Sequence, residues 1–163
     1  MKIGIVSDTH GKMHPGVMDA FAGVDAIFHA GDIGNEDIIT TLETIAPVYP
    51  VYGNVDTFPL MGKYPEVRLE TLGGKRILMT HIMLLFEPKI IKKWLTRVDE
   101  SEPPHVFIYG HTHKDRIEQL DGVLTINPGS AGPSRFRTRP SVAFLEIAEN
   151  GEMNAWIHCL QNL

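Results

Sequence analysis

The sequence has 163 residues, of which 43% are hydrophobic and 21% charged, and its formal net charge is −5. This length predicts one domain over residues 1–163, and the acidic balance excludes an extended nucleic-acid surface and attraction to an anionic membrane. No apolar run approaches about 18 residues, so we expect neither a membrane-spanning helix nor a signal peptide. The single cysteine, Cys159, excludes an internal disulfide and favours a reducing compartment, which we take to be the cytoplasm.

The first third of the chain is expected to alternate between apolar strands and amphipathic helices. The strands are predicted at residues 3–6, Asp25–Ala30 and Val48–Tyr52, and the helices at Val17–Ala22 and Asn35–Ile45, with Asn35 as the cap. Because Pro50 has no backbone N–H, the third strand is expected near the edge of a sheet. Strand–helix–strand units of this kind predict a parallel sheet with helices layered on it.

The rest of the chain is expected to be richer in strands. A loop is predicted at Phe58–Pro65 and a helix with one apolar face at Lys89–Val98. The predicted strands are Glu66–Leu69, Lys75–Thr80, His105–Tyr109, Asp115–Leu120, Val123–Asn127, Ser141–Ile147 and Met153–His158. Turns at Asp121-Gly122 and Asn150-Gly151 separate the last strands, so the second half is predicted to be antiparallel.

Side chains of the kind that bind metals follow five of these expected strands. They are Asp8, His10, Asp32, Asn54, His81, His111 and His113. Any one of them could be a polar core or capping residue, but their joint pattern favours a site at the carboxyl edge of the sheet. Seven ligands exceed the need of one ion and suit two ions about 3.5–4 Å apart. Imidazole and carboxylate together favour manganese, iron, zinc or nickel over calcium.

These motifs resemble those of the calcineurin-like metallophosphoesterases, and most closely the small YfcE-type phosphodiesterases. The shared motifs are Asp8-x-His10, Gly31-Asp32, Gly53-Asn54-x-Asp56, His81 after a strand, Gly110-His111-x-His113, Asn127-Pro128-Gly129-Ser130 and Arg139-Pro140-Ser141. The resemblance covers nearly the whole chain in the same order. It implies an α/β fold in which two β-sheets stack as a sandwich flanked by helices on both sides.

The resemblance also implies how the ligands are shared and what the reaction is. One ion would be held by Asp8, His10, Asp32 and His113, and the other by Asp32, Asn54, His81 and His111. A hydroxide bridging the two ions would attack the phosphorus of a small phosphodiester in line. We expect two divalent ions, manganese by preference, with nickel, zinc, iron or magnesium as alternatives.

Further roles are expected around this ligand set. The catalytic residues are expected to be Asp32, Asn54 and Asp56, although Asp56 could equally be an acidic turn residue. Substrate contacts are expected from Asn54 and Arg135, with a solvated loop as the alternative for Arg135. We expect His29 to lie in the core or to support the site, and not to bind a metal.

Two positions depart from the family pattern. Many relatives carry a histidine after the motif asparagine, where it protonates the leaving oxygen, and this chain has Val55. Because such an acid contributes about 10²–10⁴-fold, we expect turnover mainly of esters whose leaving group departs as a stable anion. The apolar run Ile82–Phe86 stands where relatives continue with Gly-His. It could line the substrate pocket, bury against a second copy in a homodimer, or pack beneath the following helix.

An alternative function belongs to a different class of protein. The small phosphoesterase-like subunit of the retromer coat resembles the same fold, also lacks the acid, and serves mainly as a scaffold. The alternative is therefore a catalytically weak phosphoesterase-like scaffold that binds a protein partner through the run Ile82–Phe86. The intact ligand set, which includes His10 and Asn54, favours the enzyme. Without the acid, phosphodiesters are expected to be better substrates than phosphomonoesters.

Overall fold

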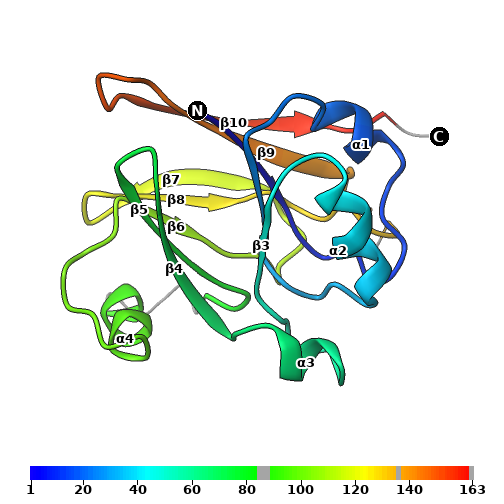
Figure 1. Ribbon diagram of the computed structural model, residues 1–163, viewed down its shortest axis with the longest axis horizontal. Coiled ribbons are helices and arrows are strands. Elements are labelled where there is room, and N and C mark those ends of the chain that lie inside the picture. The colour runs from blue at the N-terminus through cyan, green and yellow to red at the C-terminus, as the bar shows by residue number, and fades with distance from the viewer. Residues whose placement is uncertain (84–88, 135–136, 162–163) are drawn as a thin grey trace.

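The computed structural model describes residues 1–83, 89–134 and 137–161. Within these residues, two five-stranded sheets stack face to face, and helices lie outside them (Figure 1). The first sheet has the order β10-β9-β1-β2-β3, with β1 at Lys2–Val6, β2 at Ala26–His29, β3 at Val48–Pro50, β9 at Ser141–Ile147 and β10 at Met153–Cys159. The second has the order β4-β5-β6-β8-β7, with β4 at Val67–Leu72, β5 at Lys75–Thr80, β6 at Val106–Ile108, β7 at Arg116–Leu120 and β8 at Val123–Asn127.

The strand directions divide each sheet into a parallel and an antiparallel part. Strands β1, β2 and β3 are parallel, whereas β9 is antiparallel to β1 and to β10. In the second sheet β5, β6 and β8 are parallel, and β4 and β7 pair antiparallel at its edges. The parallel strands β1, β2, β3, β5 and β6 are those that precede the candidate ligands, so the ligand-bearing loops leave the sheets at corresponding ends.

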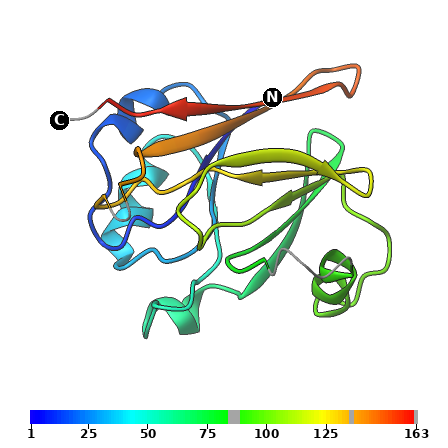
Figure 2. The same ribbon diagram turned by 180° about the vertical axis from the view of Figure 1, so that it is seen from behind.

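Alternation of side chains along the strands builds three apolar layers. Ile3 and Ile5 of β1 face the second sheet, where Ile77 and Met79 of β5 meet them in the central core. Val6, one residue beyond Ile5, belongs to the layer beneath the helices α1 (Gly16–Ala20) and α2 (Glu36–Glu43). A third layer lies between the second sheet and α4 (Ile90–Thr96), on the opposite side of the sandwich, as Figures 1 and 2 show together. Because successive side chains of a strand point to opposite faces, apolar side chains cover both faces of both sheets.

Most of the predicted elements are confirmed, with shifts of a few residues at their ends. Strand β3 lies at a sheet edge, as Pro50 predicted. The predicted loop at Phe58–Pro65 contains a short helix, α3 (Leu60–Lys63). Asn35 occupies the N-cap position of α2, as predicted, but its side chain makes no capping hydrogen bond and instead donates to the carbonyl of Gly11. The two hairpins predicted in the second half are antiparallel, as β7–β8 and β9–β10, but β8 also pairs parallel with β6, which was not predicted.

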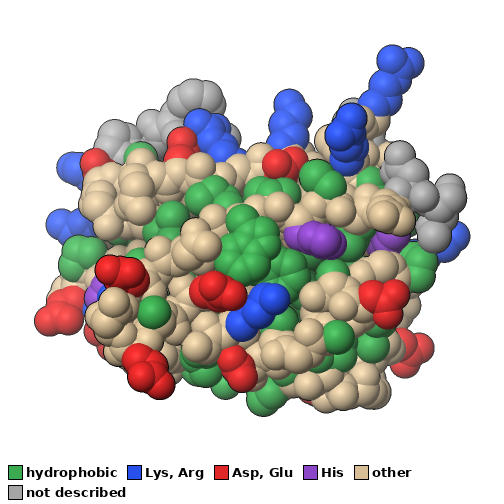
Figure 3. Space-filling view, turned by 90° about the horizontal axis from the view of Figure 1, so that it is seen from above, with side chains coloured by type: hydrophobic (Ala, Val, Ile, Leu, Met, Phe, Trp, Pro, Cys, Tyr) green, Lys and Arg blue, Asp and Glu red, His purple; other side chains and the backbone are tan. Residues whose placement is uncertain are grey.

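The surface and the helices agree with the acidic, mixed composition. No helix in the described part of the chain combines the length and hydropathy needed to cross a bilayer. On the face shown in Figure 3, acidic and basic side chains are interspersed, and neither sign of charge covers the face continuously.

Candidate metal centre

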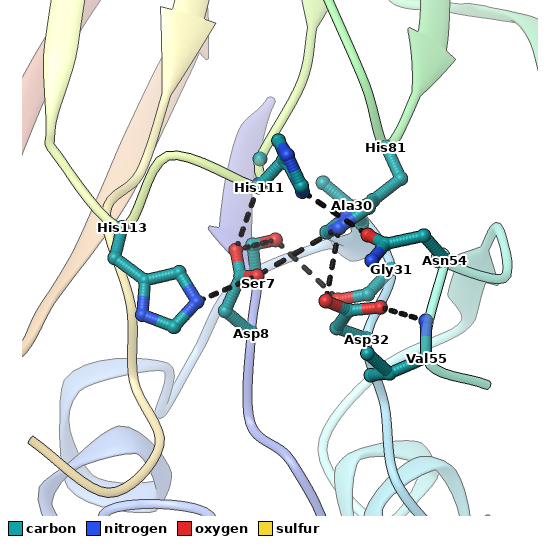
Figure 4. A network of polar contacts seen from close by, with 12 residues as sticks. Ser7, Asp8, Ala30, Gly31, Asp32, Asn54, Val55, His81, His111 and His113 are labelled. Carbon is teal, nitrogen blue, oxygen red and sulfur yellow. Dashed lines mark hydrogen bonds and ion pairs between the residues drawn. The ribbon is translucent and has the colours of Figure 1, made fainter. Parts of the chain in front are cut away.

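The loops after five strands meet at one edge of the sandwich and bring the seven predicted ligands together. Figure 4 shows side chains from the β1, β2, β3, β5 and β6 loops pointing toward one another. Two groups of these residues have ligand atoms within 4.8 Å of one another: Asp8, His10 and His113 in the first group, and Asp32, His81 and His111 in the second. Both sheets contribute to each group.

The first group is compact and largely buried. Oδ1 of Asp8 lies 3.2 Å from Nε2 of His113 and 3.8 Å from Nε2 of His10. The two imidazole nitrogens are themselves 3.3 Å apart. Three donor atoms therefore face one small volume, as a bound cation requires.

The second group surrounds Asp32. Oδ2 of Asp32 lies 3.1 Å from Nε2 of His81 and 3.9 Å from Nε2 of His10, which belongs to the first group. Asn54 joins this group through His111, whose Nδ1 lies 3.1 Å from the Asn54 side-chain oxygen. The Asp32 carboxylate thus faces both groups, as a ligand that bridges two ions must.

The backbone of these loops adopts conformations that side chains other than glycine rarely take. Positive φ angles occur at five of the seven ligands: Asp8 at 55°, His10 at 47°, Asp32 at 52°, His111 at 72° and His113 at 61°. Each such residue costs on the order of 1–3 kcal/mol and is retained where the surrounding structure holds it. Concentration of this strain on the candidate ligands is typical of a functional site.

Neighbouring groups orient the ligands. Oδ2 of Asp8 accepts a hydrogen bond from the Ser7 hydroxyl at 2.6 Å and from the His111 backbone N–H at 3.1 Å. Oδ1 of Asp32 accepts from the Val55 N–H at 3.0 Å. Nδ1 of His81 lies 2.7 Å from the Ala30 carbonyl, which can only accept, so Nδ1 carries the proton and Nε2 faces the carboxylates.

The charges of this cluster shift two pKa values. Burial raises the pKa of Asp32, but its close contact with His81, the charge of His81, the Val55 N–H and the charge of His10 together lower it below its ordinary value. Burial lowers the pKa of His81, but its contact with Asp32, the charge of Asp8 and the Ala30 carbonyl raise it overall. In the metal-free protein the pair therefore favours the ionised carboxylate and the imidazolium.

The donor set fits divalent cations. Within the described residues, the buried atoms Oδ1 of Asp8 and Nε2 of His81 make no hydrogen bond of normal geometry. Buried polar atoms of native proteins are nearly always satisfied, so such atoms side by side indicate a missing partner. Carboxylate oxygens and imidazole nitrogens are ligands that manganese, zinc, iron and nickel share. The residues present are thus suited to hold metal ions.

Asp56, for which we expected either a catalytic role or that of an acidic turn residue, is buried. Its carboxylate accepts three backbone hydrogen bonds, from Ile33 at 3.1 Å, Gly34 at 2.9 Å and Gly53 at 2.8 Å. Asp56 therefore ties the loop of Asp32 to the loop of Asn54, and its geometry is that of a positioning residue. The expected substrate contact Arg135 lies outside the described residues.

The two departures from the family motif are partly described. Val55 lies beside the site with 52% of its surface exposed, and its side chain has no proton to donate. Met83 is buried and packs in the layer beneath α4, so this residue is unavailable as a docking surface. The rest of the predicted apolar run, residues 84–86, lies outside the described residues.

The sequence did not indicate the cavity beside the site. A cavity of about 280 Å³ opens next to Asn54 and His81, and Tyr52, Lys93 and Trp94 also line it. Trp94 lies on the apolar face predicted for Lys89–Val98 and is buried. The sequence carries no signal that brings α4 near the metal ligands, because this closeness depends on the packing of α4 on the second sheet. Ser7, which orients Asp8, was also missed, and its polar side chain at the end of an apolar strand was the available signal.

Comparison with known proteins places this geometry in context. The family model of the calcineurin-like phosphoesterase superfamily domain matches residues 1–150. A probable metallophosphoesterase of Methanothermobacter thermautotrophicus is 37% identical over 152 residues, which cover 90% of this chain and 86% of that protein. A solved structure described as a novel archaeal phosphodiesterase is 26% identical, with a TM-score of 0.76, and the match covers 97% of this chain and 100% of that one.

The protein Vps29 has the same fold. The structure of a single mutant of Vps29 from Entamoeba histolytica matches with a TM-score of 0.75, covering 99% of this chain and all of the other. The two sequences are 20% identical, so this likeness concerns the fold alone.

Proposed function

This chain belongs to the calcineurin-like phosphoesterase superfamily, and on that basis we propose that it is a phosphodiesterase that uses two divalent ions to hydrolyse a small phosphodiester. The observation that carries the proposal is the position of Asp32 between two groups of imidazole and carboxylate ligands. The solved archaeal phosphodiesterase supports the choice of a diester as substrate.

The ligand assignment follows the two groups. Asp8, His10 and His113 would hold one ion, His81, His111 and Asn54 the other, and Asp32 would touch both. Two bound divalent ions supply a hydroxide nucleophile near neutral pH and neutralise charge on the phosphoryl oxygens. Manganese is the metal that we favour, because the mixed nitrogen and oxygen donors suit it.

The remaining residues orient the site and select the substrate. Ser7 and the Val55 N–H hold the carboxylates of Asp8 and Asp32 in place. Asn54 is exposed beside the cavity, where its side chain can reach a phosphoryl oxygen of a bound diester. Because Val55 cannot protonate a leaving group, esters of acidic alcohols or phenols are the preferred substrates.

The proposed function is tested with metal-stripped protein. Bis-p-nitrophenyl phosphate and p-nitrophenyl phosphate are compared as substrates, while manganese, nickel, zinc and magnesium are titrated back separately. The aryl leaving group needs no acid, so the assay reports on the metal centre. We expect metal-dependent turnover of the diester that exceeds turnover of the monoester. Absence of turnover with two ions bound would contradict the proposal.

Substitution of the shared ligand sharpens this test. Asp32→Ala is expected to lower the metal content of the protein, because it removes a ligand from both groups. Loss of a residue that only supports a ligand lowers activity about 10–100-fold, and we expect kcat/KM of Asp32→Ala to fall further than that. Asp37→Ala removes an exposed carboxylate from the first turn of α2 and serves as the matched control, with unchanged turnover expected. Full activity in Asp32→Ala would refute the assignment.

A further inference from the structure

The turn Asn127-Pro128-Gly129-Ser130 lies between the ligand loops of the two sheets. It follows β8 in the second sheet and leads to residues that pack on the first sheet. The Ser130 hydroxyl donates a hydrogen bond of 3.0 Å to the carbonyl of Asp8, 122 residues away in sequence. The next residue, Ala131, donates its N–H to the Ser7 carbonyl at 3.1 Å. One end of the turn is thus bound to the loop of Asp8 and His10.

The other end of the turn is bound to the loop that carries His111 and His113. The side-chain amide of Asn127 donates to the Gly110 carbonyl at 3.1 Å and to the Thr112 hydroxyl at 3.0 Å. Gly110 and Thr112 flank His111, and Thr112 precedes His113. Asn127 therefore binds the backbone directly before His111 and the side chain of the residue between His111 and His113.

The turn is itself held rigidly. The Asn127 side-chain oxygen accepts from the Gly129 N–H at 3.0 Å, and the Ser141 hydroxyl donates to the Pro128 carbonyl at 2.7 Å. Gly129 has a φ of +79°, and a methyl group there would lie 2.2 Å from the Ser141 oxygen, so only glycine fits. Asn127 is 0% exposed and Ser130 4% exposed. A buried turn whose polar groups are used in this way can transmit a fixed spacing between the loops it joins.

We propose that Asn127 and Ser130 are positioning residues that set the spacing of Asp8 and His10 from the histidines of the second sheet, and thereby the affinity of the centre for its ions. This inference rests on the proposed function. Its physical basis is that partners which orient metal ligands contribute about 10–100-fold to metal affinity. The two residues differ in what they hold: Ser130 binds the loop of the first ligand group only, whereas Asn127 binds the loop that serves both groups.

The first experiment compares Ser130→Ala with Thr125→Val. Both substitutions remove a buried hydroxyl, but the Thr125 hydroxyl donates to the Glu118 carbonyl of β7 and reaches no ligand-bearing loop. Manganese is titrated into each metal-stripped protein by calorimetry, and thermal unfolding of the metal-free proteins reports on the fold. We expect Ser130→Ala to bind one of its two ions about 10–100-fold more weakly, and Thr125→Val to keep both affinities.

The second experiment compares Asn127→Leu with Thr125→Val, which removes another buried side-chain hydrogen bond of β8 remote from the ligand loops. We expect Asn127→Leu to weaken both ions and Thr125→Val to weaken neither. Should Asn127→Leu fail to fold, Ser130→Ala decides the question alone.

The possible outcomes distinguish a failure of this inference from a failure of the proposed function. Two ions bound by the wild type and by Ser130→Ala with equal affinity would overturn the positioning role alone. Equal weakening in Ser130→Ala and Thr125→Val would also overturn it, because the weakening would then follow from a general loss of stability. A wild-type protein that binds no manganese would overturn the proposed function and this inference together.

Discussion

At the scale of single residues, we expect Val55 to limit which leaving groups the site can release. Its N–H holds Asp32 and its side chain is half exposed beside the exposed Asn54. We expect Val55→His to raise the hydrolysis of a dialkyl phosphodiester at least about tenfold, towards the about 10²–10⁴-fold that a general acid contributes. Bis-p-nitrophenyl phosphate should gain little, because its leaving group needs no proton.

The control for this gain is Val55→Asn, which adds a polar side chain without a titratable proton. Both variants keep the backbone N–H that orients Asp32. Equal gains in the two variants, or a gain with the aryl ester alone, would contradict the role assigned to this position.

His29 supports the site as a neutral imidazole. Its Nε2 lies 3.0 Å from the Thr9 hydroxyl, which already donates to the Ile33 carbonyl and so accepts from His29. Its Nδ1 accepts the Gly31 N–H at 3.2 Å, so a second proton there would face another donor. Burial, which outweighs the attraction of Asp56 and Asp8, lowers the pKa of His29 from 6.5 to about 4.

The consequence is a loss of stability in mild acid. Between pH 6.5 and about 4 the unfolded chain binds a proton at this residue and the folded chain does not. The free energy of unfolding of the metal-free protein should therefore fall by about 1.4 kcal/mol per pH unit in that window from this group, and His29→Gln should remove that part of the slope. Imidazole nitrogen shifts measured by NMR should show the Nε2–H tautomer at pH 6. A His29 pKa above 6 would contradict this account.

At the scale of elements, the strand ends were predictable and the contacts between loops were not. Apolar runs such as the one ending at Val6 predict where a strand stops, and the side chains that follow it share one edge of the sheet. The sequence contains no comparable signal for the hydrogen bond of Ser130 with Asp8, because the two are far apart in the chain and their approach depends on how the sheets stack. The hydrogen bonds that Asp56 accepts from Ile33 and Gly34 were unpredictable for the same reason, because these partners lie in another loop.

The closeness of these loops gives a prediction at Gly110. A methyl group there would lie 2.1 Å from the Ser7 hydroxyl and 2.9 Å from Oδ2 of Asp8. We expect Gly110→Ala to destabilise the protein by about 1–3 kcal/mol and to weaken metal binding, because Ser7 and Asp8 must move. Chemical unfolding and manganese titration measure the two effects.

Gly122 provides the comparison. Its φ is +79°, so alanine there is strained, but the added methyl meets no described atom within 4 Å. Gly122→Ala should cost about 1–2 kcal/mol of stability and leave manganese affinity unchanged. Equal metal affinity in Gly110→Ala and the wild type would show that the loop contact does not set the geometry of the centre.

At the scale of the whole molecule, the sandwich brings together ligands from two sheets. Asp8, His10 and Asp32 follow strands of the first sheet, and His81, His111 and His113 follow strands of the second. The central core of apolar residues from both sheets fixes their relative position. The fold class was predictable through the resemblance of these motifs to a family, since composition and periodicity alone indicated only an α/β protein with a parallel sheet.

Anomalous X-ray diffraction from crystals of the manganese-loaded protein would locate the bound ions directly. We expect two manganese peaks about 3.5–4 Å apart, one beside Asp8, His10 and His113 and the other beside His81 and His111, with Asp32 between them. A single peak, or peaks away from Asp32, would contradict the two-metal centre.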